Sequence, residues 1–158
     1  MKKAILLFFL FTYSSFCSSQ AKSLPKPEAH FSAIIVSDIE RSINWYTTSF
    51  GFKVLNKVVS EKRGFKQANL KCEKILVELI ELNTSLSQKE VLKSHPKKTK
   101  IDGFFKFGFI VSEFEKWIAH LKQLKVEFHG TVVTDSISKK KTVLILDPDG
   151  NRIQLFEK

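Results

Sequence analysis

The sequence is short of the residues that cross-link or interrupt a fold. Its 158 residues include only two cysteines, four prolines and six glycines, and the cysteines, Cys17 and Cys72, form no Cys-x-x-Cys motif. No Cys/His cluster has zinc spacing either, so a structural zinc site is not supported. The overall composition argues against disorder, collagen-like repeats and coiled coil. A composition of 43% hydrophobic and 27% charged residues indicates one ordinary globular domain.

Acidic residues and arginine are also scarce. Asp and Glu number 16 against 26 for Lys and Arg, which gives a net charge of +10, yet the only arginines are Arg41, Arg63 and Arg152. Proteins that read nucleic-acid bases rely on arginine more than this. We therefore expect no nucleic-acid partner. The charge is better explained by a solvated lysine-rich surface, which could favour an anionic ligand.

The N-terminus has the pattern of an export signal. Two lysines precede a continuous apolar run over residues 4–11, and small and polar residues follow. The run is too short to span a membrane, which needs about 20 apolar residues. We predict a signal peptide over residues 1–19, cleaved after Ser19, and a secreted or periplasmic protein of residues 20–158 without stable membrane insertion. The alternatives are a lipoprotein anchor on Cys17 and a buried N-terminal strand or helix.

The rest of the chain consists of two halves with the same order of elements. Residues 29–82 contain a strand, a helix over residues 39–50 and three further strands, and residues 104–158 repeat that order around a helix over residues 113–125. A polar, lysine-rich linker, residues 83–103, joins the halves. The expected strands cover Phe31–Ser37, Phe52–Val59, Phe65–Cys72 and Ile75–Leu82 in the first half, and Phe104–Ser112, Val126–Val133, Lys141–Asp147 and Arg152–Glu157 in the second.

This repeated order predicts an α+β fold of two tandem βαβββ modules. Module one is residues 29–82 and module two is residues 104–158. A four-stranded sheet with a helix on one face leaves its other face bare. We expect the two bare faces to pair around one cleft, which is where a ligand site would lie.

Two stretches of sequence carry a family resemblance. Residues 31–54 combine a strand that ends in Val-Ser-Asp, a helix with Trp45-Tyr46, and Phe50-Gly51-Phe52, while residues 147–157 read DPDGNRIQLFE. Together they resemble the vicinal oxygen chelate (VOC) superfamily of glyoxalases, extradiol dioxygenases and bleomycin-resistance proteins, over about residues 29–158. The resemblance implies the paired-module fold. Modules of this family pair either within a chain or across a homodimer, so a homodimer is one option here.

The resemblance also locates the family's metal-binding positions, one in the first strand and one in the last strand of each module. Here they fall on Phe31, Glu78, Lys106 and Gln154. Only Glu78 is a normal ligand for a divalent cation, and the Lys106 ammonium would repel one. We therefore predict no metal ion and no cofactor. His30 would reach the site only if the first strand slipped by one residue, which would turn its apolar side chains the wrong way.

Alternation along the strands selects the side chains that line the cleft. The expected ligand-binding residues are Phe31, Ala33, Ile35, Gln67, Asn69, Leu76, Glu78, Ile80, Lys106, Gly108, Ile110, Arg152, Gln154 and Phe156. Residues of the opposite parity, such as Phe107 and Leu155, should pack on the helices. Without a metal ion the Glu78 carboxylate needs a cationic partner, and we expect it to form an ion pair with Lys106.

These observations favour an exported, metal-free protein that binds a small molecule in the cleft, with an anionic molecule as one option. Two enzyme alternatives remain open. One is a glyoxalase- or dioxygenase-type metalloenzyme that uses Glu78 with a degenerate ligand set. The other is a metal-free lyase or isomerase in which Glu78 is the base. In either enzyme the one candidate catalytic residue is Glu78.

Overall fold

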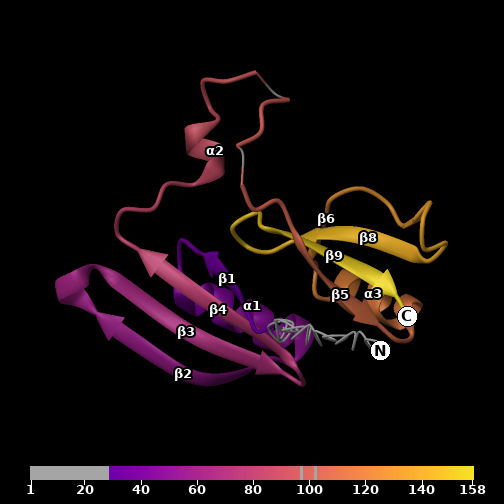
Figure 1. The fold of residues 1–158 in the computed structure, drawn as a ribbon, viewed down its shortest axis with the longest axis horizontal. Helices are drawn as coiled ribbons and strands as arrows, with labels where there is room; N and C mark the ends of the chain where they lie inside the picture. Colours follow the sequence, from indigo (N-terminus) through magenta and orange to yellow (C-terminus); the bar gives the residue numbers. More distant parts are fainter. Residues whose placement is uncertain (1–28, 97, 102) are drawn as a thin grey trace, which may run out of the picture.

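Two β-sheets, each backed by one helix, make up the fold (Figure 1). The computed structural model describes residues 29–96, 98–101 and 103–158. Its elements are β1 (Ser32–Ile35), α1 (Ile39–Phe50), β2 (Lys53–Ser60), a 3₁₀ turn (Glu61–Arg63), β3 (Phe65–Cys72), β4 (Ile75–Leu82), α2 (Gln88–Val91), β5 (Phe107–Val111), α3 (Phe114–Gln123), β6 (Glu127–Phe128), β7 (Val133–Thr134), β8 (Lys141–Leu146) and β9 (Arg152–Glu157). The predicted α+β fold of two βαβββ modules is confirmed. The predicted signal peptide lies outside the described residues.

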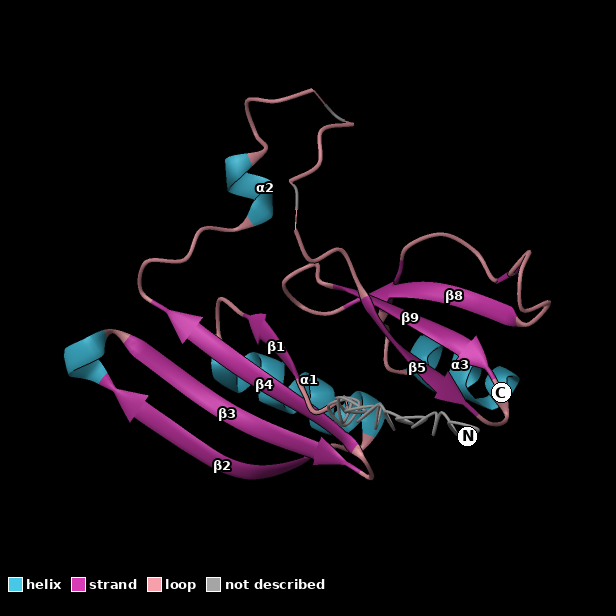
Figure 2. Cartoon of the chain, in the orientation of Figure 1, coloured by secondary structure: helices cyan, strands magenta, loops and turns pink. Residues whose placement is uncertain are grey.

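The two sheets are built in the same order. Module one has the strand order β1-β4-β3-β2, and module two has β5-β9-β8-β6 with the short β7 paired to β8. In each module the first strand pairs in parallel with the last strand, and the remaining pairs are antiparallel. The helices lie behind their sheets, so both uncovered sheet faces turn the same way (Figure 2). No helix among the described residues is long and apolar enough to cross a membrane.

Helix α1 has the boundaries that its sequence predicts. Asp38 caps its start, because the carboxylate accepts the backbone N–H of Arg41 at 3.0 Å. Gly51 ends it in the left-handed conformation at φ 70°, where a glycine pays no steric penalty. Glu81 of β4 accepts the backbone N–H of Ile39 at 2.8 Å, and so ties the first turn of the helix to the sheet.

Alternate side chains on each sheet are buried beneath the helix, as the sequence parity predicts. The buried strand residues include Ile34, Val77 and Leu79 in module one, and Phe109, Val111, Ile153 and Leu155 in module two. Phe107 is half-buried and packs against the same core. Because one parity points to the helix, the other parity lies on the uncovered face.

Two predicted strands of module two are wrong in their bounds. The strand expected over Phe104–Ser112 begins only at Phe107, and Phe104 and Phe105 are exposed outside it. The strand expected over Val126–Val133 is split into β6 and β7. Gly130 lies between these pieces at φ 101°, a backbone conformation that interrupts an extended strand and that the alternating pattern alone does not reveal.

The turn between β8 and β9 joins the two modules. Asp147 is almost fully buried and accepts the backbone N–H groups of Asp149 and Asn151, each at 2.9 Å. The hydroxyl of Tyr46, on α1 of the other module, donates to Asp147 Oδ2 at 3.1 Å, and Arg41 pairs with Asp149 at 2.8 Å. Burial, followed by the Asp147 charge, raises the pKa of Tyr46 well above its usual value, so this hydroxyl stays a donor.

Candidate functional site

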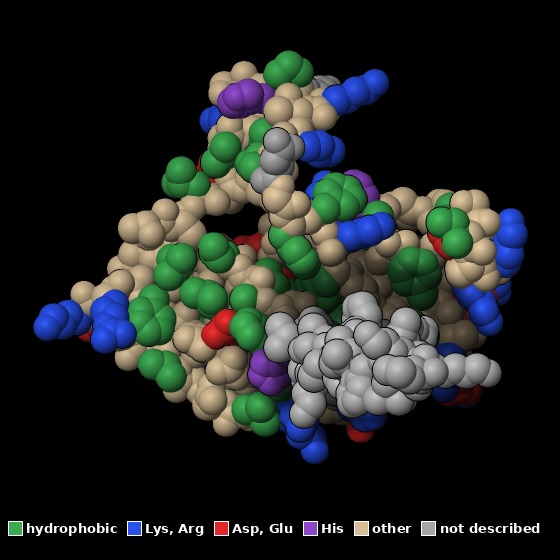
Figure 3. All heavy atoms as spheres, viewed as in Figure 1, with side chains coloured by type: hydrophobic (Ala, Val, Ile, Leu, Met, Phe, Trp, Pro, Cys, Tyr) green, Lys and Arg blue, Asp and Glu red, His purple; other side chains and the backbone are tan. Residues whose placement is uncertain are grey.

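The uncovered face of module one holds a hollow of about 290 Å³. It is lined by His30, Phe31, Leu55, Asn56, Gln67, Asn69, Leu76 and Glu78. Hydrophobic side chains are spread over this side of the molecule around a few acidic ones (Figure 3). A mainly apolar lining with a few convergent polar groups is typical of a small-molecule site.

Strand register brings the polar groups of the hollow together. Asn69 of β3 is paired with Glu78 of β4, and Asn56 of β2 is paired with Asn69. The Gln67 amide donates to the Glu78 carboxylate, and the Asn69 amide donates to Asn56 Oδ1 at 2.7 Å. Glu78 is half-buried and lines the hollow. The hollow therefore offers one carboxylate and three amides to a bound molecule.

The hollow contains five of the fourteen residues that the sequence predicts for the ligand site. These are Phe31, Gln67, Asn69, Leu76 and Glu78. Ala33, Ile35 and Ile80 share the parity of this face but do not line the hollow. The remaining six, Lys106, Gly108, Ile110, Arg152, Gln154 and Phe156, lie together on the uncovered face of module two. The structure thus divides the predicted lining between two faces.

Three residues of the hollow were not predicted. Leu55 and Asn56 come from β2, whose pairing with β3 shifts register between Val54 and Asn56. Such a bulge breaks the alternation from which a face is read, so sequence parity could not place them. His30 was expected to reach the site only through a register slip. It lines the hollow from the segment before β1 while Phe31 keeps its predicted face.

The predicted ion pair between Glu78 and Lys106 is wrong. Lys106 donates instead to Gln154 Oε1, and Glu78 accepts from Gln67. The ion pairs formed within the described part of the chain involve neither of these two residues. Each charged group has a neutral hydrogen-bond partner on its own sheet.

The side chains at the family's metal-binding positions do not fit a divalent ion. Phe31 has no atom that could coordinate a metal. Of the two module-two positions, only Gln154 has a side-chain oxygen, and that oxygen accepts a hydrogen bond from the Lys106 ammonium. The described residues contain no group of three or more His, Cys, Asp or Glu side chains placed to hold a metal. Glu78 and His30 are the two best ligands in the hollow. Two protein ligands fall short of the set that a resident catalytic metal normally has.

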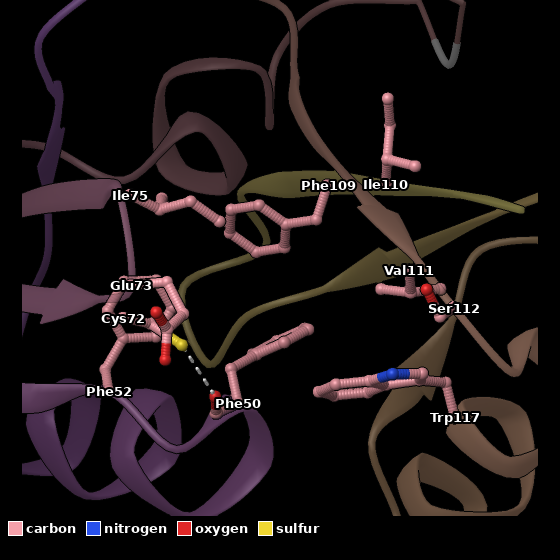
Figure 4. Close-up of a pocket in the computed structure, with 10 residues that line it drawn as sticks. All are labelled: Phe50, Phe52, Cys72, Glu73, Ile75, Phe109, Ile110, Val111, Ser112 and Trp117. Carbon is pink, nitrogen blue, oxygen red and sulfur yellow. Dashed lines mark hydrogen bonds between the residues drawn. The ribbon is translucent and has the colours of Figure 1, made fainter. Parts of the chain in front are cut away.

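A second hollow, of about 210 Å³, lies where the modules meet (Figure 4). Phe50 and Trp117 stack across it with ring centroids 5.6 Å apart, and Phe109 approaches Phe50 at 5.1 Å. The Cys72 thiol donates to the Phe50 carbonyl at 3.5 Å. Aromatic packing dominates this hollow, and polar side chains do not converge on it, which indicates a packing junction between modules.

The fold and the open face define an α+β domain of paired βαβββ modules with a ligand-sized hollow. The profile of the Glyoxalase/Bleomycin resistance protein/Dioxygenase superfamily matches residues 29–155, and the chain belongs to that superfamily, the VOC superfamily. YwkD of Bacillus subtilis (strain 168), itself described as uncharacterized, is 26% identical over 129 residues, 81% of this chain and 94% of YwkD.

Two solved structures illustrate the likeness of fold. SMU.1112c superposes with a TM-score of 0.71 at 25% identity, over 83% of this chain and 98% of its own. A glyoxalase family protein from Enterococcus faecalis gives the same TM-score and identity, over 82% of this chain and 97% of its own. The resemblance inferred from the sequence is therefore confirmed.

Proposed function

We propose that this protein binds a small molecule in the hollow of module one without a metal ion. The observation that carries the proposal is the composition of the hollow. Phe31, Leu55 and Leu76 supply apolar contact, while Glu78 and the amides of Gln67 and Asn69 supply fixed hydrogen-bonding groups. A ligand with an apolar body and at least one hydrogen-bond donor matches this lining.

A second candidate is a metal-free lyase or isomerase with Glu78 as its base. The position of Glu78 favours it, because this carboxylate lies in the hollow and would be within reach of a proton on a bound molecule. The two candidates differ in one observable. A bound molecule is recovered unchanged from a binding protein, and is recovered as a different compound from the enzyme.

A thermal-shift screen of a metabolite library tests the binding proposal. A true ligand at one hundred times its dissociation constant should raise the melting temperature by about 10 °C. That shift should largely disappear in Glu78→Gln and persist in Glu127→Gln, a matched substitution on exposed β6. If a compound gave the same shift in Glu78→Gln, Glu127→Gln and Gln67→Leu, it would bind outside the hollow. That result would contradict the proposal.

We also propose that the chain is exported. The support is the basic, apolar and small-residue pattern of residues 1–19. Intact-mass measurement of the protein recovered outside the cytoplasm should give a chain that begins at Gln20. A retained Met1, or a lipid on Cys17, would contradict this proposal.

A further inference from the structure

Three pairs of residues cross the uncovered face of module two from end to end. Strands β5 and β9 are parallel, with Gly108 paired to Gln154 and Ile110 paired to Phe156. Lys106 and Arg152 precede them in the same register, because Phe107 is paired with Ile153. We call these six residues the module-two strip. It has a cationic end, a polar middle and an apolar end.

The cationic end has N–H donors that are available to a ligand. The Arg152 guanidinium carbon lies 4.7 Å from the centre of the Phe105 ring, a cation–π contact. Within the described chain neither Arg152 nor Lys106 pairs with a carboxylate, and the Arg152 side chain has no hydrogen-bond acceptor. Two adjacent cations repel each other, so an oxyanion between them would be favourable, and a guanidinium can bind one through two parallel hydrogen bonds.

Asp135, an acidic group whose charge interacts with that of Lys106, has other partners. Asp135 accepts the backbone N–H groups of Ile137 and Ser138 and the Ser138 hydroxyl. Those bonds to Ser138 are the main reason that its pKa is lowered, and the Lys106 charge contributes least. Asp135 therefore stabilises its own loop and leaves Lys106 available.

A chain of hydrogen bonds fixes the polar middle of the strip. Lys106 donates to Gln154, the Gln154 amide donates to Thr142 Oγ1 at 2.8 Å, and the Thr142 hydroxyl donates to the Leu155 carbonyl at 2.7 Å. Thr142 is buried on the neighbouring strand β8, in register with Phe156, and its hydroxyl orients the Gln154 amide. Gly108 lies beside it without a side chain, and a Cβ there would come within 2.8 Å of the Gln154 carbonyl oxygen. The middle of the strip is therefore low, and both ends of the Gln154 amide have hydrogen-bond partners.

The apolar end is uncovered. Ile110 is 73% exposed in the middle of a strand, an unusual position for a large aliphatic side chain, and its partner Phe156 is half-buried. From Lys106 to Ile110 the strand advances about 13 Å. The strip thus matches the length and polarity of a small amphipathic molecule with its charge at one end.

We propose that the module-two strip binds a small amphipathic anion. Its carboxylate or phosphate would be held by Lys106 and Arg152, and its apolar body would lie over Gly108 against Ile110 and Phe156. The positive charges of Lys106 and Arg152, which no carboxylate of the described chain pairs with, favour an anionic ligand. The exposed Ile110 favours a ligand with an apolar body. The strip shares no residue with the hollow of module one, so this proposal stands or falls separately from the proposed function.

A series of n-alkanoates from acetate to decanoate, titrated into the purified protein by calorimetry, tests both ends of the strip. Affinity should rise about two- to fourfold for each added methylene, since each one is removed from water. Decanol and decylamine should bind at least tenfold more weakly than decanoate, because they lack the anion. Equal binding of decanol and decanoate would overturn the proposal.

Five variants, one of them a control on α3 and one in module one, assign the binding to residues. Lys106→Met and Arg152→Met should each weaken decanoate binding tenfold or more, while Lys116→Met, at an exposed position of α3, should leave it unchanged. Ile110→Ser, at an exposed position that folding does not require, should flatten the dependence on chain length but spare the binding of short alkanoates. Full affinity in both Lys106→Met and Arg152→Met would overturn the proposal. So would loss of decanoate binding in Glu78→Gln, because it would move the anion to module one.

Discussion

Replacing Asp147 with alanine should lower the free energy of unfolding by about 3–5 kcal/mol. Asp147 is only 4% exposed and accepts four hydrogen bonds, including one from Tyr46 of the other module. Truncation leaves the buried Tyr46 hydroxyl and the backbone donors of the turn without their acceptor. The loss should appear as a shift of the urea midpoint in equilibrium unfolding followed by circular dichroism.

Asp135→Ala is the matched control for this prediction. Asp135 also accepts backbone N–H bonds within a turn, but it is only half-buried, so water can replace the lost acceptor. We expect it to cost about 1 kcal/mol or less. Similar losses in Asp147→Ala and Asp135→Ala would mean that the β8–β9 turn is not the joint between the modules.

The cost of Asp147→Ala should also depend on pH. Burial raises the pKa of Asp147 above its usual value of 3.8, although the hydrogen bonds from Asn151, Asp149 and Tyr46 oppose that rise. A raised pKa means that the folded state holds the proton more tightly than the unfolded state. The stability that this proton contributes is complete below 3.8 and is lost as the pH rises through the folded-state pKa. The difference between wild type and variant should therefore grow as the pH falls from 7 toward 4.

Replacing Phe50 with alanine should cost about 3–5 kcal/mol. Phe50 is 7% exposed at the end of α1, and its ring contacts Phe109 and Trp117 of the other module. Truncation would enlarge the hollow at the module junction and remove two aromatic contacts at once. Equilibrium unfolding measures the loss directly.

The control for Phe50 is Phe104→Ala. Phe104 is 67% exposed, and its removal should cost no more than about 1 kcal/mol. If the two substitutions cost the same, the aromatic junction does not hold the modules together. In that case their arrangement would depend chiefly on the β8–β9 turn.

Local signals in the sequence were enough to place most elements. The bounds of α1 follow from the Asp38 cap and from Gly51, and β3, β4 and β9 have the predicted ends because clear turn residues flank them. The predicted strand over 126–133 failed at Gly130, whose backbone conformation depends on the turn around it. The buried face of each sheet was also predictable, since alternation determines it.

The site was less predictable, because it depends on which neighbouring side chain each charged group takes as its hydrogen-bond partner. The prediction that Glu78 meets Lys106 assumed that both modules turn their charged groups to one point. In the structure each group bonds to an amide on its own sheet, Gln67 for Glu78 and Gln154 for Lys106. The bulge in β2 likewise hid Asn56, since one extra residue changes which side chains face the hollow.

Elemental analysis of the purified protein by inductively coupled plasma mass spectrometry tests the central claim, that this member of the VOC superfamily works without a metal ion. The broken ligand set, with Phe31 and Lys106 at two of its positions, predicts no stoichiometric divalent metal. The metal content should also be unchanged in Glu78→Ala. Zinc, nickel, manganese or iron bound in stoichiometric amount to the wild type and lost from Glu78→Ala would contradict the account.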